Sequence, residues 1–201
     1  MEYKTTVISE RRRNEICEAA KHCFLKKGFQ STTMEDVIKE TGMSKGGVYR
    51  YYKSTIDMLY DIMERGNEYR FDLVGEFVKK NPDMTKEELA IELVLEKMFA
   101  QNEYKSIYAM FLMECGKNEK LKELKCRLQK KMLDEFLEFA QRSGLDILKC
   151  FANDDFLQLM YAMFIADEFM DIRDLFLNKS DLFRDIISNY LKKQKAGDSA
   201  D

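Results

Sequence analysis

The sequence is poor in residues that interrupt helices and in residues that bind metals. It has one proline, Pro82, and no alternation of β-branched and polar residues, so it predicts an all-α fold. Its single histidine, His22, excludes the paired Glu-x-x-His motifs of a di-iron bundle. Metal-ligand spacings, a nucleophile elbow and a phosphate loop are also missing. We therefore expect no enzyme, no metal and no cofactor.

Long apolar runs and paired cysteines are also absent. No stretch approaches the roughly 18 to 20 uninterrupted apolar residues of a membrane span, and the start, MEYKTTVISERRR, lacks the apolar core of a secretory signal. We therefore expect a cytoplasmic protein without a membrane partner. The five cysteines form no C-x-x-C pair and leave one unpaired under any disulfide scheme. They are interpreted as reduced and mostly buried, with redox sensing by one of them as the alternative.

The charges divide the chain into two parts. Residues 1–54 hold 11 Lys and Arg against 7 Asp and Glu, a net charge of +4, so the remainder of this −3 chain carries −7. A basic N-terminal part favours a polyanionic partner such as DNA. Its densest cluster is Arg11-Arg12-Arg13, which either contacts DNA or lies on a solvated helix face.

Residues 33–59, TMEDVIKETGMSKGGVYRYYKSTIDML, predict two short helices joined by a glycine turn, with a third helix following. Thr33 and Asp36 form a variant of the capping box at the start of the first helix. Gly42 suits the positive φ that ends this helix. Ser44 then caps a second helix, whose position suits recognition of a DNA duplex.

The second helix begins with two glycines, although each costs about 1 kcal/mol relative to alanine in a helix interior. Their missing side chains would let the backbone of Gly46 and Gly47 approach a phosphate or a base edge. The basic and aromatic run that follows suits phosphate and base-edge contacts. For Tyr52, packing against neighbouring helices is an equally good interpretation.

Residues 9–63 resemble the DNA-binding domain of the TetR family of one-component bacterial regulators. The resemblance rests on an ordered series of residues: Ala19-Ala20, Phe24, Gly28-Phe29, Thr32-Thr33, Ile38, Gly42, Ser44-Lys45-Gly46, Val48 to Ser54, and Leu59. It implies a DNA-binding set made of Thr33, Ser44, Lys45, Gly46, Gly47, Tyr49, Arg50, Tyr51, Lys53 and Thr55. Thr55 departs from the family pattern, because many members have a lysine at this position.

We expect about nine helices in two domains and a connection. Residues 1–54 would form a three-helix helix-turn-helix domain and residues 55–81 a connecting helix. Residues 82–194 would form a helical bundle for ligand binding and dimerisation, and residues 195–201 a disordered tail. The eighth helix is expected over about 154–177.

Met, Phe and Tyr crowd two central segments of the expected bundle. Part of this excess would line a cavity for an apolar or aromatic ligand, with ordinary core packing as the alternative for each residue. The candidate ligand-binding residues are Tyr104, Tyr108, Phe111, Glu114, Met160, Met163, Phe164 and Asp167. If Glu114 and Asp167 face a cavity, they would select a cationic or hydrogen-bond-donating ligand.

The resemblance further implies a homodimer that pairs through its last two long helices and binds a palindromic operator in double-stranded DNA. Such a protein is commonly a repressor that a small effector releases from DNA. Two alternatives remain at this stage. The C-terminal bundle could bind a protein partner instead of a metabolite, or the chain could be a helical adaptor that does not bind DNA.

Overall fold

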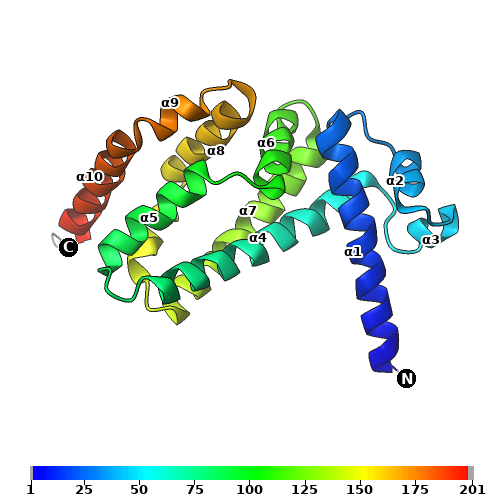
Figure 1. Cartoon of the computed structure of the whole chain (residues 1–201), viewed down its shortest axis with the longest axis horizontal. Helices are drawn as coiled ribbons and strands as arrows, with labels where there is room; N and C mark the ends of the chain where they lie inside the picture. The colour runs from blue at the N-terminus through cyan, green and yellow to red at the C-terminus, as the bar shows by residue number, and fades with distance from the viewer. Residues whose placement is uncertain (1, 199–201) are drawn as a thin grey trace. The chain divides into compact units, whose positions relative to one another are not determined.

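The computed structural model describes residues 2 to 198, and the side chains of residues 7 to 195. Over this range the chain forms ten α-helices and one 3₁₀ helix (Figure 1). The prediction of an all-α fold is therefore confirmed. None of the helices in the described range is long and apolar enough to cross a membrane.

The helices form two compact units, which alternate along the chain. Unit 1 comprises Met1–Asn67 and Asn102–Leu128, and unit 2 comprises Glu68–Gln101 and Gln129–Asp201. The chain passes from one unit to the other within α4 (Thr55–Lys80), again after Gln101, and a third time within α7 (Glu119–Arg142).

Unit 1 places the N-terminal helices together with a later one. Besides the first parts of α4 and α7, it contains α1 (Glu2–Lys27), α2 (Met34–Thr41), α3 (Lys45–Tyr49) and α6 (Glu103–Cys115). Both α2 and α6 pack against α1. The fully buried side chains of Phe24 and Phe111 come from α1 and α6. A helix from the middle of the sequence is thus part of the core that supports the first three helices.

Unit 2 is built around α5 (Lys86–Phe99). Its other helices are the second parts of α4 and α7, η1 (Asp146–Phe151), α8 (Asp154–Phe169), α9 (Arg173–Leu177) and α10 (Ser180–Asp198). Helix α5 contacts η1, α8, α9 and α10, and α10 runs along it (Figure 1). The Phe99 ring, near the end of α5, lies 5.1 Å from that of Phe183 and 6.2 Å from that of Phe176, centroid to centroid.

Several helix ends follow from local sequence. Thr85 and Glu88 form a capping box at the start of α5. Gly28 directly follows the last residue of α1 and adopts φ 82°, which ends the helix. The expected helix over 154–177 is wrong, because the chain breaks at Asp171, which adopts φ 50°. An ion pair between Arg173 Nη1 and Asp167 Oδ2, 3.1 Å long, spans this break. Helix α10 continues to Asp198, and residues 199–201 of the expected tail lie outside the described range.

Candidate DNA-binding surface

The turn between α2 and α3 is held by the caps that the sequence predicts. The Thr33 hydroxyl accepts from the Asp36 amide at 3.2 Å, and the Asp36 carboxylate accepts from the Thr33 amide at 2.7 Å. Gly42 ends α2 with φ 64°, and the Ser44 hydroxyl accepts from the Gly47 amide at 3.2 Å. The predicted capping box, glycine turn and serine cap are confirmed.

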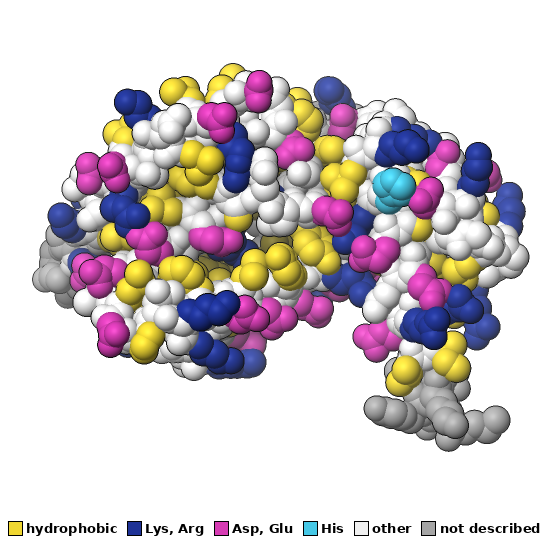
Figure 2. All heavy atoms as spheres, viewed as in Figure 1, with side chains coloured by type: hydrophobic (Ala, Val, Ile, Leu, Met, Phe, Trp, Pro, Cys, Tyr) yellow, Lys and Arg dark blue, Asp and Glu magenta, His cyan; other side chains and the backbone are white. Residues whose placement is uncertain are grey.

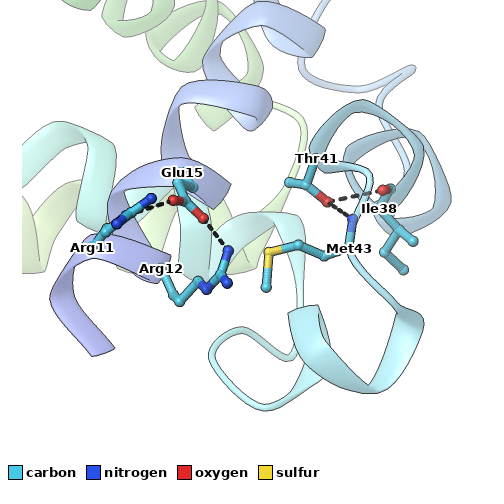
Figure 3. Close-up of polar contacts among 6 residues, drawn as sticks. All are labelled: Arg11, Arg12, Glu15, Ile38, Thr41 and Met43. Atoms are coloured by element: carbon cyan, nitrogen blue, oxygen red, sulfur yellow. Dashed lines mark hydrogen bonds and ion pairs between the residues drawn. The ribbon is translucent and has the colours of Figure 1, made fainter. Parts of the chain in front are cut away.

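Thr41, the last residue of α2, also stabilises the turn through its hydroxyl group. The Thr41 hydroxyl donates to the Ile38 carbonyl at 2.9 Å and accepts from the Met43 amide at 3.1 Å (Figure 3). This side chain therefore links the last turn of α2 to the segment that leads into α3. The signal in the sequence was a threonine directly before the C-cap glycine, where a hydroxyl can bond to backbone groups on both sides.

The inner side of the α3 segment is anchored by Val48 and Tyr52, which are 0% and 2% exposed. The Tyr52 hydroxyl donates to Asp61 Oδ2 at 2.6 Å and lies 3.1 Å from the Cys17 sulfur. The Arg13 guanidinium lies over the Tyr52 ring, 5.2 Å from its centroid. Burial, and then the hydrogen bond to Asp61, raise the pKa of Tyr52. Tyr52 thus joins α1 and α4 behind α3, as the packing interpretation proposes.

The outer side of α3 is exposed. Lys45, Gly46 and Arg50 are exposed, whereas Tyr49 is half-buried. The Lys53 ammonium donates to the Tyr49 carbonyl at 2.9 Å, so one predicted DNA contact also caps the end of α3. Tyr51 and Thr55 are half-buried, and Thr33 is exposed. All ten predicted DNA-binding residues lie in one short stretch of unit 1.

The two glycines of α3 differ in their surroundings. A Cβ on Gly47 would lie 3.2 Å from the Ser44 hydroxyl and 3.5 Å from the Met43 side chain, so the cap itself favours a small residue there. A Cβ on Gly46 would meet no atom within 4 Å. Packing inside the chain therefore accounts for Gly47 but not for Gly46, whose missing side chain leaves room for an external molecule.

Basic side chains surround α1 to α3, with acidic ones among them (Figure 2). In the Arg11-Arg12-Arg13 cluster, Arg11 and Arg12 turn toward Glu15 (Figure 3), with N–O distances of 3.0 and 2.6 Å. These two bonds, that of Arg12 first, lower the pKa of Glu15. Arg13 instead reaches Asp61 in α4 at 2.9 Å. Arg13 therefore links α1 to α4 within unit 1.

The Asp36 carboxylate connects the start of α2 to α1. It accepts from the Thr33 hydroxyl at 2.5 Å and pairs with the Lys27 ammonium. The bond from Lys27, followed by those from Thr33, holds the pKa of Asp36 well below its ordinary range. A DNA phosphate at the start of α2 would therefore compete with the Asp36 carboxylate for hydrogen bonds from the Thr33 amide and hydroxyl.

The predicted ligand-binding residues fall into two sets in different units. In unit 1, Tyr108 and Phe111 are buried with ring centroids 5.9 Å apart. The Tyr104 ring lies against Gly66, and the Lys21 ammonium sits 4.7 Å from its centroid. In unit 2, the four residues are Met160, Met163, Phe164 and Asp167, of which Met160 and Phe164 are buried.

The acidic residues among these candidates have partners within their own units. Glu114 accepts a hydrogen bond from the Gln30 side chain, and the Asp167 side chain, 4% exposed, pairs with Arg173. Asp171, after the end of α8, is exposed. Selection of a cationic ligand by Glu114 and Asp167 stays a prediction.

The cysteines of the described chain form no disulfide. Cys17, Cys23 and Cys115 are buried, and burial raises the pKa of each thiol, that of Cys115 to about 11. Reactive thiols need a lowered pKa and access, so these three are interpreted as packing residues. Cys126 is exposed.

Comparison with known proteins agrees with this geometry. Residues 16–61 match the sequence profile of the bacterial regulatory proteins of the tetR family. The HTH-type transcriptional regulator YfiR of Bacillus subtilis (strain 168) is 53% identical over 57 residues, which is 28% of each chain. The match thus spans little more than a quarter of that relative.

Solved structures extend the likeness in fold to most of the chain. Salmonella enterica GusR superimposes with a TM-score of 0.62 at 16% identity, covering 90% of this chain and 96% of GusR. A transcriptional regulator of the TerR/AcrR family from Aquifex aeolicus VF5 gives a TM-score of 0.53 at 22% identity, covering 90% and 98%.

Proposed function

We propose that this chain, whose N-terminal domain belongs to the TetR family of bacterial regulatory proteins, is a transcriptional repressor that binds a palindromic operator in double-stranded DNA. The observation that carries the proposal is the division of the α3 segment. Val48 and Tyr52 hold its inner side, while Lys45, Gly46 and Arg50 are exposed on its outer side. A short, firmly anchored helix with an exposed cationic face suits entry into a major groove.

The proposed protein acts as a homodimer. Apolar side chains are exposed along the last helices of unit 2, and hydrophobic groups reach the surface over α8 and α9 (Figure 2). The exposed residues are Leu159, Phe169, Met170, Leu175, Leu177, Leu182 and Ile186. Leu182 and Ile186 are one helical turn apart on α10, where pairing with a second copy would cover them. Two α3 helices about 34 to 36 Å apart would then contact successive major grooves.

A small apolar or aromatic effector, bound within residues 82–194, would release the repressor from DNA in the cytoplasm. The Met and Phe residues of α8 support this part of the proposal, since flexible apolar side chains adapt to variable ligand shapes. A coupling free energy of about 1 to 3 kcal/mol between effector and DNA suffices to lower operator affinity several-fold.

The test begins with selection of duplexes from a random library by the full-length protein, followed by fluorescence anisotropy at several salt concentrations. Arg50→Ala and Tyr49→Ala should each weaken binding about tenfold or more, because they remove contacts from the outer side of α3. Lys79→Met, on the exposed surface of α4, is the matched control and should bind like the wild type. Salt-dependent binding that survives both α3 substitutions would refute this assignment of the recognition helix.

A further inference from the structure

Two arginines of α1 share one carboxylate at the surface of unit 1. Arg11 donates from Nε to Glu15 Oε1 at 3.0 Å, and Arg12 donates from Nη1 to Glu15 Oε2 at 2.6 Å. Each guanidinium has further N–H donors beyond the one used in these bonds. Two positive charges against one negative charge leave a net charge of +1. The group therefore presents a cationic surface even with its internal ion pairs formed.

This part of α1 runs beside the α3 segment. The guanidinium of Arg13, the next residue, lies 5.2 Å from the centroid of the Tyr52 ring, and Tyr52 is three residues beyond the end of α3. Met43, which leads into α3, extends its side chain toward Arg12 (Figure 3). Lys and Arg side chains gather on the side of α1 that faces α3 (Figure 2). The shared-carboxylate group is thus a neighbour of the proposed recognition helix.

The ion pairs with Glu15 are weak enough for a phosphate to replace them. The side chains of Arg11 and Arg12 are 77% and 46% exposed, and that of Glu15 is 36% exposed. Ion pairs at such positions contribute little to stability, because water and salt screen them. A DNA duplex carries one phosphate charge per roughly 1.7 Å of its axis, and a guanidinium can bind phosphate oxygens through two parallel N–H groups. Exchange of the one carboxylate for several phosphates is therefore favourable.

We propose that Arg11 and Arg12 bind the phosphate backbone of DNA beside the groove that α3 enters, and that Glu15 holds them until phosphate takes its place. This inference rests on the proposed function and adds a contact outside the helix-turn-helix segment. It divides the arginine cluster, because two members contact DNA while Arg13 links α1 to α4. Glu15 is a positioning residue whose negative charge also opposes the phosphate.

Fluorescence anisotropy with two duplexes tests the arginines in the full-length protein. One duplex carries a selected operator sequence, and the other has equal length and a scrambled sequence. Arg11→Met and Arg12→Met should each weaken binding to both duplexes about threefold or more, because phosphate contacts do not depend on sequence. The dependence of log Kd on log salt concentration should become less steep by about 1 per protomer for each variant.

The chain offers a matched control in unit 2. Arg142 on α7 also forms an exposed ion pair along its helix, with Glu138 at 2.7 Å. Arg142→Met removes the same charge from the same kind of pair and should change neither the affinity nor the salt dependence. Urea denaturation of every variant shows whether it remains folded. Arg12→Lys keeps the charge and should preserve the salt dependence of the wild type.

Glu15→Gln tests the exchange itself. It should strengthen binding to both duplexes about threefold, because the phosphates no longer compete with a carboxylate for the two arginines. A residue that served only to stabilise α1 would not strengthen DNA binding when it is replaced. Glu138→Gln is the control and should have no effect. Wild-type affinity in both arginine variants would overturn the proposal, and so would wild-type or weaker affinity in Glu15→Gln.

The two duplexes also separate this inference from the proposed function. Arg50→Ala should weaken binding to the selected duplex more than to the scrambled one, since it removes a contact with base edges. If the wild type prefers the selected duplex and loss of Arg11 or Arg12 has no effect, only the phosphate contact is refuted. If both duplexes bind equally and binding depends on Arg12, the phosphate contact stands and the operator-specific repressor function fails. Binding of neither duplex would refute both.

Discussion

At the scale of single residues, two tyrosines three positions apart have opposite environments. Tyr49 lies half-buried beside exposed Arg50, with the Lys45 ammonium 5.7 Å from its ring centroid. Tyr52 is buried and bonded to Asp61. Residues at positions i and i+3 of one helix would share a face. Helix α3 ends at Tyr49, so Tyr52 lies beyond the helix and its ring points to different surroundings.

Tyr52→Phe should therefore destabilise the protein while leaving the DNA-binding surface intact. The change removes the hydroxyl that donates to Asp61 and leaves the Asp61 carboxylate paired with Arg13. We expect the free energy of unfolding to fall by about 1 to 3 kcal/mol, measured by urea denaturation. Tyr49→Phe is the control and should change stability little. If Tyr52→Phe is as stable as the wild type, the hydroxyl is not part of the core.

At the scale of helices, α4 and α6 meet closely within unit 1. A Cβ on Gly66 would lie 3.0 to 3.1 Å from Cδ1, Cβ and Cγ of Tyr104. These atoms include the base of the side chain, so α6 itself would have to move to make room. The same end of α6 is tied to α1, because the Lys21 ammonium lies 3.0 Å from the Glu103 carboxylate. The start of α6 thus contacts both α1 and α4.

Gly66→Ala should destabilise the protein, in contrast to the same change elsewhere in α4. Overpacking against Tyr104 costs about 1 to 3 kcal/mol and outweighs the gain of about 1 kcal/mol in helix propensity. Gly75→Ala is the matched control, since its Cβ would meet no atom within 4 Å and the substitution should stabilise by up to about 1 kcal/mol. Urea denaturation of both variants measures the difference. Equal stabilisation by both would mean that Tyr104 does not constrain α4.

At the scale of the whole molecule, the exposed apolar side chains of unit 2 favour the pairing of two copies of the chain. Leu182 and Ile186 are 55% and 46% exposed, which is unusual for neighbouring apolar residues on one helix face. In the proposed dimer they would be covered by a second copy. A symmetric operator would then be bound by two α3 helices, and affinity would depend on the dimer.

Leu182→Glu together with Ile186→Glu should convert a dimer into a monomer, since four charges would meet at a two-fold interface. Sedimentation analysis measures the mass, and anisotropy should show at least about tenfold weaker binding to a selected palindrome. Met113→Glu is the control, because Met113 is 44% exposed but lies in unit 1. A double variant that remains dimeric would place the interface elsewhere.

The ends of the helices were the most predictable part of the fold. Thr33, Gly42, Ser44 and Thr85 act on groups within four residues of themselves, so a sequence window contains both partners. The break at Asp171 was not foreseen, because the apolar pattern continues through it. The ion pair between Arg70 of α4 and Glu96 of α5 was also missed, because its two residues lie 26 positions apart in the sequence.

The sequence by itself determined the all-α class, the caps and turn of the helix-turn-helix segment, and its likeness to the TetR family, because these depend on residue types at short spacings. Only the tertiary structure decided that Tyr52 is a core residue, that α6 packs with α1, and that Arg70 pairs with Glu96 of α5. Each of these depends on which helix faces meet. Contacts such as Lys21 with Glu103, 82 positions apart, are set by packing rather than by local pattern.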